Sequence, residues 1–204
     1  MTKFTHTIKA LPKIWKIPDN KKLQIMSEKL TTSEIHLGKN TELNLIVFLK
    51  KGWDKNQEQK FILEGENSKI NFTCAIMGKG KNNFSFQTTS QHKAKNTKAD
   101  FLVRAVLFDE SKVNYLGNIQ IEKGAEMSSA HLSHDSLILS EKAKTKTTPS
   151  LEIKADNVKA GHSATIGKID ENIIFYMQTR GLNTKNCKKL IIENFIKSCL
   201  TRKN

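Results

Sequence analysis

A histidine within a run of alternating apolar and polar residues is the first candidate for chemistry in this chain. His162 lies in the segment A-G-H-S-A-T-I-G, which follows the corner Asp156-Asn157. A neutral imidazole binds iron and other transition metals, and it titrates near neutral pH. The alternation, however, places His162 on the same strand face as Ala160 and Ala164, which predicts a side chain inside the core. Metal ligand and core histidine therefore both stay open as interpretations of His162.

Three other histidines lie near predicted strands. His131 and His134 are three residues apart, just before the apolar run L-I-L at 137–139, and they are interpreted as polar corner residues or as further ligands. His92 lies between Gln91 and Lys93, and we expect it to be exposed. His134 is kept with His162 as a candidate site residue because of a family resemblance described below.

The carboxylates do not form the pair that an enzyme would need. A glycosidase uses two converging carboxylates roughly 5–10 Å apart. The nearest candidates are Glu152, which the alternation turns outward, and Asp156 at a corner. The chain contains no G-x-x-x-x-G-K-[ST] loop, so ATP hydrolysis would belong to a partner. We expect no catalytic residues and no enzyme activity.

The cysteines point to a reducing compartment. Cys74, Cys187 and Cys199 are far apart and form no C-x-x-C pair, so they fit neither a disulfide framework nor a zinc module. Each is predicted to be a small buried apolar residue. The first residues lack the apolar stretch of a signal peptide, and no run reaches the ~20 apolar residues of a membrane span. We expect a cytoplasmic location.

The charge of the chain leaves a second class of function open. The net charge is +14, and positive charge clustered on one surface would neutralise the phosphates of a nucleic acid. Of the 34 basic residues, however, only Arg104, Arg180 and Arg202 are arginine, the residue that favours bidentate phosphate recognition. The lysines are spread along the chain. A lysine-rich solvated surface is therefore preferred, and a basic nucleic-acid-binding module is kept as the alternative.

Short alternating runs dominate residues 33–168 and predict a β core. The runs recur roughly every eight to twelve residues, with glycines or polar corners between them. Such spacing is compatible with a sandwich, a barrel or a solenoid. Corners such as Asp109-Glu110-Ser111 and Lys123-Gly124 are short, yet they are not the Asn-Gly or Asp-Gly pairs of hairpins. We therefore favour a parallel β-solenoid, in which the chain bends at each corner and its coils stack.

The two ends of the chain are predicted to differ from this core. Residues 1–32 contain two prolines and are expected to be an irregular N-terminal segment. Residues 169–204 are predicted to be α-helical. Asp170 caps a short first helix that Gly181 ends, and a second helix begins at residue 183 or 184.

The second helix carries a broad apolar stripe. Its apolar residues, at spacings of three and four, are Cys187, Leu190, Ile191, Phe195 and Cys199, and they are flanked by Ile192, Ile196 and Leu200. This stripe is wider than one packing contact needs. Either the helix packs against the end of the solenoid, or part of the stripe is a docking face for another protein.

Four motifs of the chain match one family. They are V-L-F-D-E-S from Val106, P-S-L-E-I from Pro149, A-D-N-V-K-A-G-H-S-A-T-I-G from Ala155 and F-Y-M-Q-T-R-G-L from Phe175. Over roughly residues 60–200 the chain resembles the SufB/SufD family of the iron–sulfur cluster assembly machinery, the SUF system.

Within this family the chain is more similar to SufD than to SufB. Ser163 follows His162 where SufB carries a glutamate, and His134 stands where SufB has its cysteine. The chain is also shorter than typical members at both ends, which is expected to affect ATPase docking more than the solenoid.

The resemblance implies a mainly β fold, a right-handed parallel β-helix followed by a small α-helical C-terminal domain. It implies a non-catalytic scaffold subunit that pairs through its β-helix with a SufB-type subunit, or with a second copy as a homodimer. It also implies docking of a SufC-type ABC ATPase on the C-terminal helices. The resemblance assigns His162 and His134 to cluster assembly and the subunit interface. It also implies that His162 is the metal ligand. The partner-binding residues are Phe175, Tyr176, Arg180, Leu190, Ile191 and Phe195.

No cofactor is expected to be held stably by this chain alone, and an iron–sulfur cluster is expected at the subunit interface. A competing hypothesis is a SufB-like scaffold that itself holds the nascent cluster. That role needs thiolate ligands. Cys74, Cys187 and Cys199 are not expected to converge, so the SufD-like role is preferred.

Overall fold

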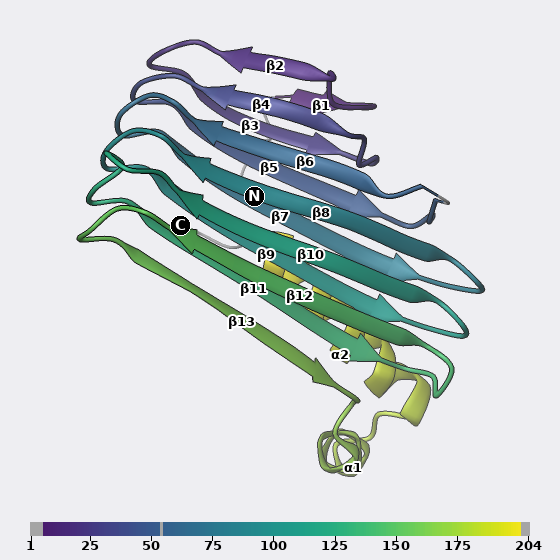
Figure 1. Cartoon of the computed structure of the whole chain (residues 1–204). Coiled ribbons are helices and arrows are strands. Elements are labelled where there is room, and N and C mark those ends of the chain that lie inside the picture. Colours follow the sequence, from purple (N-terminus) through teal and green to yellow (C-terminus); the bar gives the residue numbers. More distant parts are fainter. Residues whose placement is uncertain (1–5, 54, 201–204) are drawn as a thin grey trace.

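The computed structural model of the protein describes residues 6–53 and 55–200. Among these residues, two parallel β-sheets face each other along the molecule and two helices follow them (Figure 1). Sheet A has seven strands in the order β1-β3-β5-β7-β9-β11-β13, and sheet B has six in the order β12-β10-β8-β6-β4-β2. Odd and even strands thus alternate between the sheets, which is how a chain that bends at each corner builds stacked coils.

The strands are short near the N-terminus and lengthen along the chain. Sheet A contains β1 (His6–Ile8), β3 (Lys22–Ser27), β5 (Glu42–Leu49), β7 (Lys69–Gly78), β9 (Lys98–Leu107), β11 (Ser129–Ile138) and β13 (Lys159–Gly167). Sheet B contains β2 (Ile14–Ile17), β4 (Ser33–Leu37), β6 (Gln57–Leu63), β8 (Asn83–His92), β10 (Lys112–Ile121) and β12 (Lys144–Ile153). The helices are α1 (Glu171–Thr179) and α2 (Thr184–Leu200). The predicted β-solenoid with C-terminal helices is confirmed, and the sandwich and barrel alternatives are wrong.

The expectation of an irregular segment over residues 1–32 is wrong for the residues that the structure describes. β2 pairs in parallel with β4, and β3 pairs with β5 in the register Lys22↔Glu42. Pro12 precedes β2 and Pro18 directly follows it, so both prolines lie outside the hydrogen-bonded strand, where they are tolerated. Because Ile17 is buried, this first part of the chain already belongs to the solenoid core.

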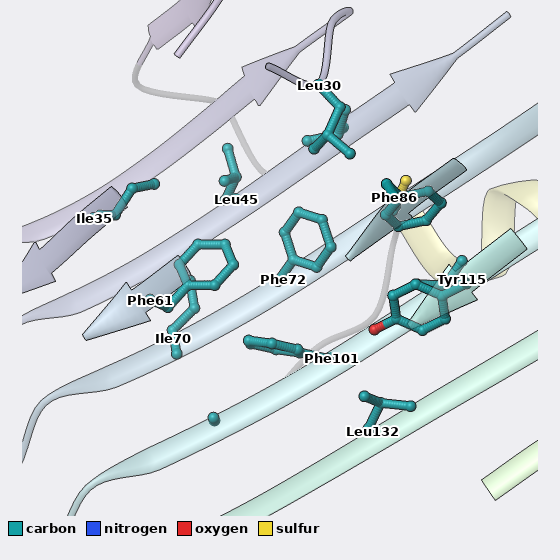
Figure 2. Packing of buried hydrophobic residues seen from close by; sticks show 14 of the residues in the cluster. Leu30, Ile35, Leu45, Phe61, Ile70, Phe72, Phe86, Phe101, Tyr115 and Leu132 are labelled. Carbon is teal, nitrogen blue, oxygen red and sulfur yellow. The ribbon is translucent and has the colours of Figure 1, made fainter. Parts of the chain in front are cut away.

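The core lies between the two sheets and is richest in aromatic rings at its centre. Phe61 of β6 faces Phe72 of β7 and Phe101 of β9, and the ring centroids of these three residues are 5.2–5.6 Å apart (Figure 2). All three side chains are buried. Burial of each ring contributes about 1.5–3 kcal/mol. These rings join sheet A to sheet B.

One corner of the solenoid is built by a column of asparagines. Asn20, Asn40, Asn67, Asn96 and Asn157 have φ angles between 52° and 61°, in the left-handed region that asparagine tolerates better than most residues. The amide of Asn40 donates to Asn20 Oδ1, and the amide of Asn67 donates to Asn40 Oδ1, both at 3.0 Å. The predicted corner at Asn157 is thus confirmed as a bend.

The helices lie beside the solenoid and do not cover its last coil (Figure 1). Asp170 Oδ1 accepts a hydrogen bond from the backbone of Asn172 at 2.8 Å, and Gly181 ends the helical segment with φ +88°, as predicted. α2 contacts β7 and β9. Its buried Ile196 and Cys199 pack on an apolar patch of the outer face of sheet A, made by Ala75, Leu102, Val106 and Leu137.

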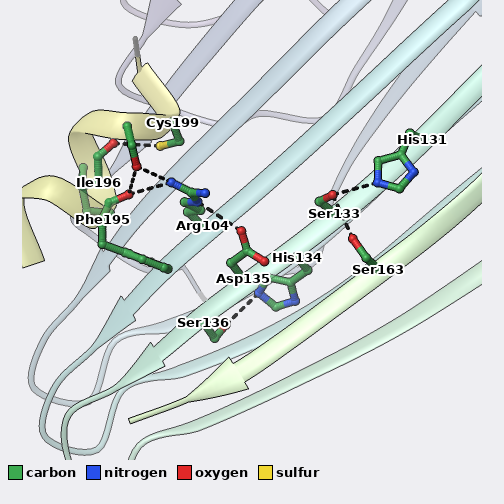
Figure 3. Close-up of polar contacts among 11 residues, drawn as sticks. Arg104, His131, Ser133, His134, Asp135, Ser136, Ser163, Phe195, Ile196 and Cys199 are labelled. Atoms are coloured by element: carbon green, nitrogen blue, oxygen red, sulfur yellow. Dashed lines mark hydrogen bonds and ion pairs between the residues drawn. The ribbon is translucent and has the colours of Figure 1, made fainter. Parts of the chain in front are cut away.

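Arg104 binds α2 to this outer face of sheet A. Arg104 projects from β9, and its Nε donates to Asp135 Oδ2 at 3.1 Å (Figure 3). The same guanidinium donates to the carbonyl oxygen of Phe195 at 3.0 Å and to the hydroxyl of Ser198, and it lies 5.0 Å from the ring centroid of Phe195. The expectation that α2 packs against the solenoid end is therefore wrong, because β9 is apolar on both faces and its outer face binds the helix.

Candidate functional site

The last coil, formed by β12 and β13, places His162 at the open end of the solenoid. His162 is the register partner of the buried Leu132 on β11, so its side chain has the inward parity that the alternation predicted. It is nevertheless exposed, because no further coil lies beyond β13 among the described residues. The core interpretation was right about direction and wrong about burial. Within the described part of the chain, the imidazole makes no hydrogen bond or ion pair that would occupy its nitrogens.

Apolar side chains surround His162 on the same open end. Leu151 and Ile153 on β12 and Ile166 on β13 are 40%, 45% and 55% exposed. All three have inward parity, since their register partners on β10 and β11 face the core. Their direction follows from the alternation along β12 and β13, and their exposure follows from their place at the end of the stack. This interior-type surface is open to a second protein.

Both strands of the last coil are also sheet edges. Among the described residues, β13 pairs only with β11, and β12 pairs only with β10. An edge strand has unpaired N–H and C=O groups that can bind another strand. β12 contains Pro149, which lacks an N–H and is tolerated at edges. β13 contains no proline, so it has the more complete backbone edge.

His134 is buried one coil below, which contradicts its interpretation as a polar corner residue. It lies inside β11, and its ring stands edge-on to Tyr115 with the centroids 5.5 Å apart. Its Nε2 lies 2.9 Å from the hydroxyl of Ser136, and its Nδ1 is hydrogen-bonded to the hydroxyl of Thr147 (Figure 3 shows the ring and Ser136). Burial lowers the pKa of His134 to about 4. His134 is therefore a neutral core residue whose two nitrogens are already hydrogen-bonded.

The other two histidines considered above, His131 and His92, also differ in burial. His131 points to the outer face of sheet A, where its Nε2 lies 3.0 Å from the hydroxyl of Ser133, which also contacts Ser163 (Figure 3). His92 is buried, so its predicted exposure is wrong. Its Nδ1 is 2.7 Å from the hydroxyl of Thr97, and burial lowers its pKa to about 4. The alternation that runs through β8 was the signal that could have found this.

The cysteines are buried and free, as predicted. Cys74 lies inside the solenoid, Cys187 lies between the two helices, and Cys199 lies on the face of α2 that packs on sheet A. Burial raises the pKa of the Cys74 thiol far above its usual range, and it raises the pKa of Cys199 to about 11. Cys74 and Cys199 are thus in places that disfavour the thiolate, which is the form that binds metal.

The helices present a second exposed apolar surface, on α1 and the first half of α2. Phe175, Tyr176 and Leu190 are 68%, 59% and 46% exposed, and the Arg180 guanidinium lies 5.5 Å from the ring centroid of Tyr176. The two remaining residues predicted to bind a partner, Ile191 and Phe195, are partly buried. Phe195 packs on the solenoid beneath Arg104, so its main contact is intramolecular.

The described residues, 6–53 and 55–200, contain neither a cluster of metal ligands nor a helix that could cross a membrane. No group of three histidine, cysteine, aspartate or glutamate side chains is arranged to hold a metal ion there. Neither helix in this part of the chain is long and apolar enough to cross a membrane.

The family follows from a comparison with known proteins. Residues 22–195 match the family model described as SUF system FeS cluster assembly, SufBD core domain. The chain belongs to the SufB/SufD family. The match begins within the first strands and includes β13, both exposed surfaces and most of α2. The resemblance that the motifs indicated is therefore confirmed.

Curated relatives place the chain near SufD within this family. It is 29% identical to the iron–sulfur cluster assembly protein SufD of Escherichia coli over 65% of this chain, and 28% identical to SufD of Bacillus subtilis over 78% of this chain. It is also 28% identical to an iron–sulfur cluster assembly SufBD family protein of Synechocystis sp. over 80% of this chain. The aligned regions span 31%, 36% and 42% of the lengths of these relatives, so the chain matches less than half of each.

Proposed function

We propose that this chain is a SufD-like, non-catalytic subunit of an iron–sulfur cluster assembly scaffold. In this proposal it pairs through the open end of its solenoid with a SufB-type subunit, or with a second copy of itself. The helices dock an ABC-type ATPase, which supplies the ATP hydrolysis. We place the complex in the cytoplasm, a reducing compartment in which Cys74, Cys187 and Cys199 stay free thiols.

The pairing is inferred from the exposure of interior side chains in the last coil. Leu151, Ile153 and Ile166 point toward the core and are nevertheless 40–55% exposed. A second β-helix with its own open end would bury these side chains and would pair with the edge of β13. Membership of the SufB/SufD family favours a SufB-type subunit as that second β-helix.

Charge substitutions in the last coil test this pairing. Ile166→Glu, or Leu151→Glu, would place a carboxylate in the proposed apolar interface, so we expect at least a tenfold loss of affinity for a co-expressed SufB-type subunit. The matched control is Ile14→Glu, which changes a 61% exposed isoleucine on β2, far from the last coil. Sedimentation velocity of the purified mixtures would measure the complex. Equal complex formation by all three variants would exclude the open end as the interface.

His162 is proposed as the residue that this chain contributes to cluster assembly at the interface. Its imidazole is exposed, and its nitrogens have no partner in the described part of the chain. A neutral imidazole is a suitable ligand for iron. The chain brings no thiolate to this end, because Cys74 is sealed in the core and Cys199 is buried between α2 and sheet A. The sulfur ligands of the cargo cluster are therefore assigned to the partner subunit.

Replacement of His162 tests its role in cluster assembly separately from the pairing of the subunits. We expect His162→Ala to leave the complex intact and to reduce the iron and sulfide assembled on it under anaerobic conditions. His131→Ala, one strand away on the outer face of sheet A, is the matched control and should assemble normal amounts. Normal assembly by His162→Ala would remove His162 from the proposal. Stoichiometric cluster on the isolated chain would instead favour the SufB-like alternative.

The exposed face of the helices is proposed to dock the ATPase. Phe175 and Tyr176 lie side by side on α1 and are more than half exposed. We expect the double substitution Phe175→Ala/Tyr176→Ala to abolish recovery of the ATPase by affinity purification while the SufB-type subunit is still recovered. Met127→Ala is the control, since Met127 is 59% exposed on a corner of the solenoid. Unchanged recovery of the ATPase would place its binding site elsewhere.

A further inference from the structure

A pocket at the ends of β3 and β5 is separate from both surfaces described above. Its lining residues lie at the turns from β3 to β4 and from β5 to β6. Figure 1 shows these strands in the N-terminal half of the solenoid. Its volume is about 520 Å³, within the range of sites that hold small organic molecules. We call it the Trp53 pocket, and its main walls are Leu30, Phe48, Leu49, Lys50, Lys51 and Trp53.

The inner walls of the Trp53 pocket are apolar. Leu30 and Leu49 are buried and belong to the solenoid core, and Trp53 packs partly against the same core. Phe48 points to the opposite face of β5 from Leu49 and is partly exposed. Phe48 and Trp53 are thus the two apolar side chains of the lining that are only partly buried, and their aromatic surface suits a ligand with a flat apolar body.

The Trp53 side of the pocket is held in place by the neighbouring strand. The backbone N–H of Trp53 donates to the carbonyl of Asn83, and its indole N–H donates to the carbonyl of Ser85, both at 2.9 Å. The indole ring also stands edge-on to Phe84 with the centroids 5.6 Å apart. Gly52 allows this close approach, because a Cβ there would collide with the backbone of Asn83. The wall is therefore formed before any ligand binds.

The rim of the pocket is positively charged. Lys29, Lys50 and Lys51 are exposed and line the opening, and Glu28 is the only acidic residue among the lining side chains that the structure describes. No carboxylate of the described residues lies within ion-pairing distance of these three lysines. The ammonium of Lys50 lies 5.0 Å from the ring centroid of Phe48. Positive charge and an aromatic surface are therefore combined at the mouth of the cavity.

We propose that the Trp53 pocket binds a small aromatic anion. Its ring would lie against Trp53 and Phe48, and its acidic group would lie among the three lysines. A simple inorganic anion would leave the apolar walls uncovered, and a neutral aromatic molecule would leave the lysines without a counter-charge. This proposal rests on the pocket alone and does not depend on the role in cluster assembly.

A second hollow on the molecule can be compared with the Trp53 pocket. It is a wide trough of about 1050 Å³ on the outer face of sheet A, where Lys69, Lys98 and Lys159 lie beside polar residues such as Asn71 and Ser129. It has lysines but no aromatic wall. Substitutions in the trough therefore control for charge alone.

The test uses 8-anilinonaphthalene-1-sulfonate, an aromatic sulfonate, as the probe. Trp15→Phe leaves Trp53 as the only tryptophan, so the protein has one indole N–H resonance to follow by ¹⁵N–¹H NMR. We expect this resonance to shift in a saturable titration. Lys50→Gln/Lys51→Gln should raise Kd by about tenfold, because two exposed charge contacts are lost. Lys98→Gln/Lys159→Gln in the trough should leave Kd unchanged.

Two companion probes make the outcome decisive. Inorganic phosphate should leave the indole resonance in place, and the neutral N-phenyl-1-naphthylamine should bind at least tenfold more weakly than the sulfonate. The proposal is overturned if the indole resonance does not respond to the sulfonate. It is equally overturned if the neutral probe binds as tightly, or if the lysine substitutions at the pocket and in the trough have the same effect.

Discussion

The middle coils and the last coil of the solenoid have the same strand pairing and the same alternation, yet their inward side chains differ in exposure. Ile119 on β10 is 2% exposed, and its register partner Leu151 on β12 is 40% exposed. Ile121 is 1% exposed, and its partner Ile153 is 45% exposed. Both members of each pair are inward aliphatic side chains. Burial in a solenoid therefore depends on having a coil on both sides.

Because of this difference in exposure, inward side chains stabilise the fold in the middle coils and can bind a partner in the last coil. An inward side chain in the middle coils contributes its burial to folding, since neighbours contact it from both sides. An inward side chain in the last coil leaves about half of its surface for a partner to bury, since Leu151, Ile153 and Ile166 are 40–55% exposed. The predictions below compare matched positions in the two regions.

The largest difference is expected for truncation of an inward side chain. Phe101→Ala removes a ring that packs on Phe61 and Phe72, and it should lower the free energy of unfolding by about 3–5 kcal/mol. Leu151→Ala in the last coil should change it by less than about 0.5 kcal/mol. Urea denaturation followed by circular dichroism measures both. A loss of several kcal/mol from Leu151→Ala would mean that the isolated chain already buries the last coil.

The next difference concerns pH. Burial lowers the pKa of His134 from 6.5 to about 4, so the unfolded chain takes up a proton at a pH where the folded chain does not. The free energy of unfolding should therefore fall as the pH is lowered from 6.5 to 4, by about 3 kcal/mol for this residue. His134→Gln should flatten the profile. Buried His92 adds a similar slope in both proteins. Parallel profiles for His134→Gln and the unmodified chain would contradict the prediction.

Two glycines provide a smaller matched pair. A Cβ at Gly117 on β10 would collide with the side chain of Leu132, so Gly117→Ala should destabilise the chain by about 1–3 kcal/mol. In the last coil, a Cβ at Gly161 would meet only His131 Nδ1 at 3.8 Å, and Gly161→Ala should change stability by less than about 0.5 kcal/mol. Thermal unfolding compares the two. Shortening Leu132 to alanine should reduce the cost of Gly117→Ala, and equal costs with and without that change would rule out the collision.

The smallest effect is expected at a corner. Met127 has φ +62° in the position that asparagine holds at neighbouring corners, and the left-handed region is unfavourable for methionine. Met127→Asn should therefore stabilise the chain by about 0.5–1 kcal/mol. Asn96→Met, one coil earlier in the same column, should destabilise it by a similar amount. If both substitutions change the melting temperature in the same direction, the corner geometry does not control stability here.

Several features of the fold could be predicted from local patterns. Alternation identified inward residues as different as Phe72 and His162, because side chains on a strand alternate between its faces in any context. The cap at Asp170 and the stop at Gly181 follow from backbone groups at helix ends. The corner asparagines are a further signal in the sequence, since Asn67 and Asn96 recur at about the length of one coil.

The remaining features depend on neighbours far away in the chain. The expected exposure of His92 was wrong because its polar neighbours Gln91 and Lys93 suggested a loop, whereas pairing with β6 and β10 extends β8 through it. The expected role of α2 at the solenoid end was wrong because the outer face of sheet A has its own apolar patch. The alternation through β8 is a local signal for the burial of His92, whereas the segment of α2 contains no signal for the face of the solenoid on which it packs.

The sequence by itself determined the repeating β pattern, the helical C-terminal part, the family and the inward direction of His162. Only the tertiary structure decided that His162 is exposed while His134, also inward, is sealed. Parity is a property of one strand, whereas burial requires a coil stacked on each side. β11 has β9 and β13 as neighbours, and β13 has only β11 among the described residues. That single missing neighbour turns a core position into a surface that another protein can bind.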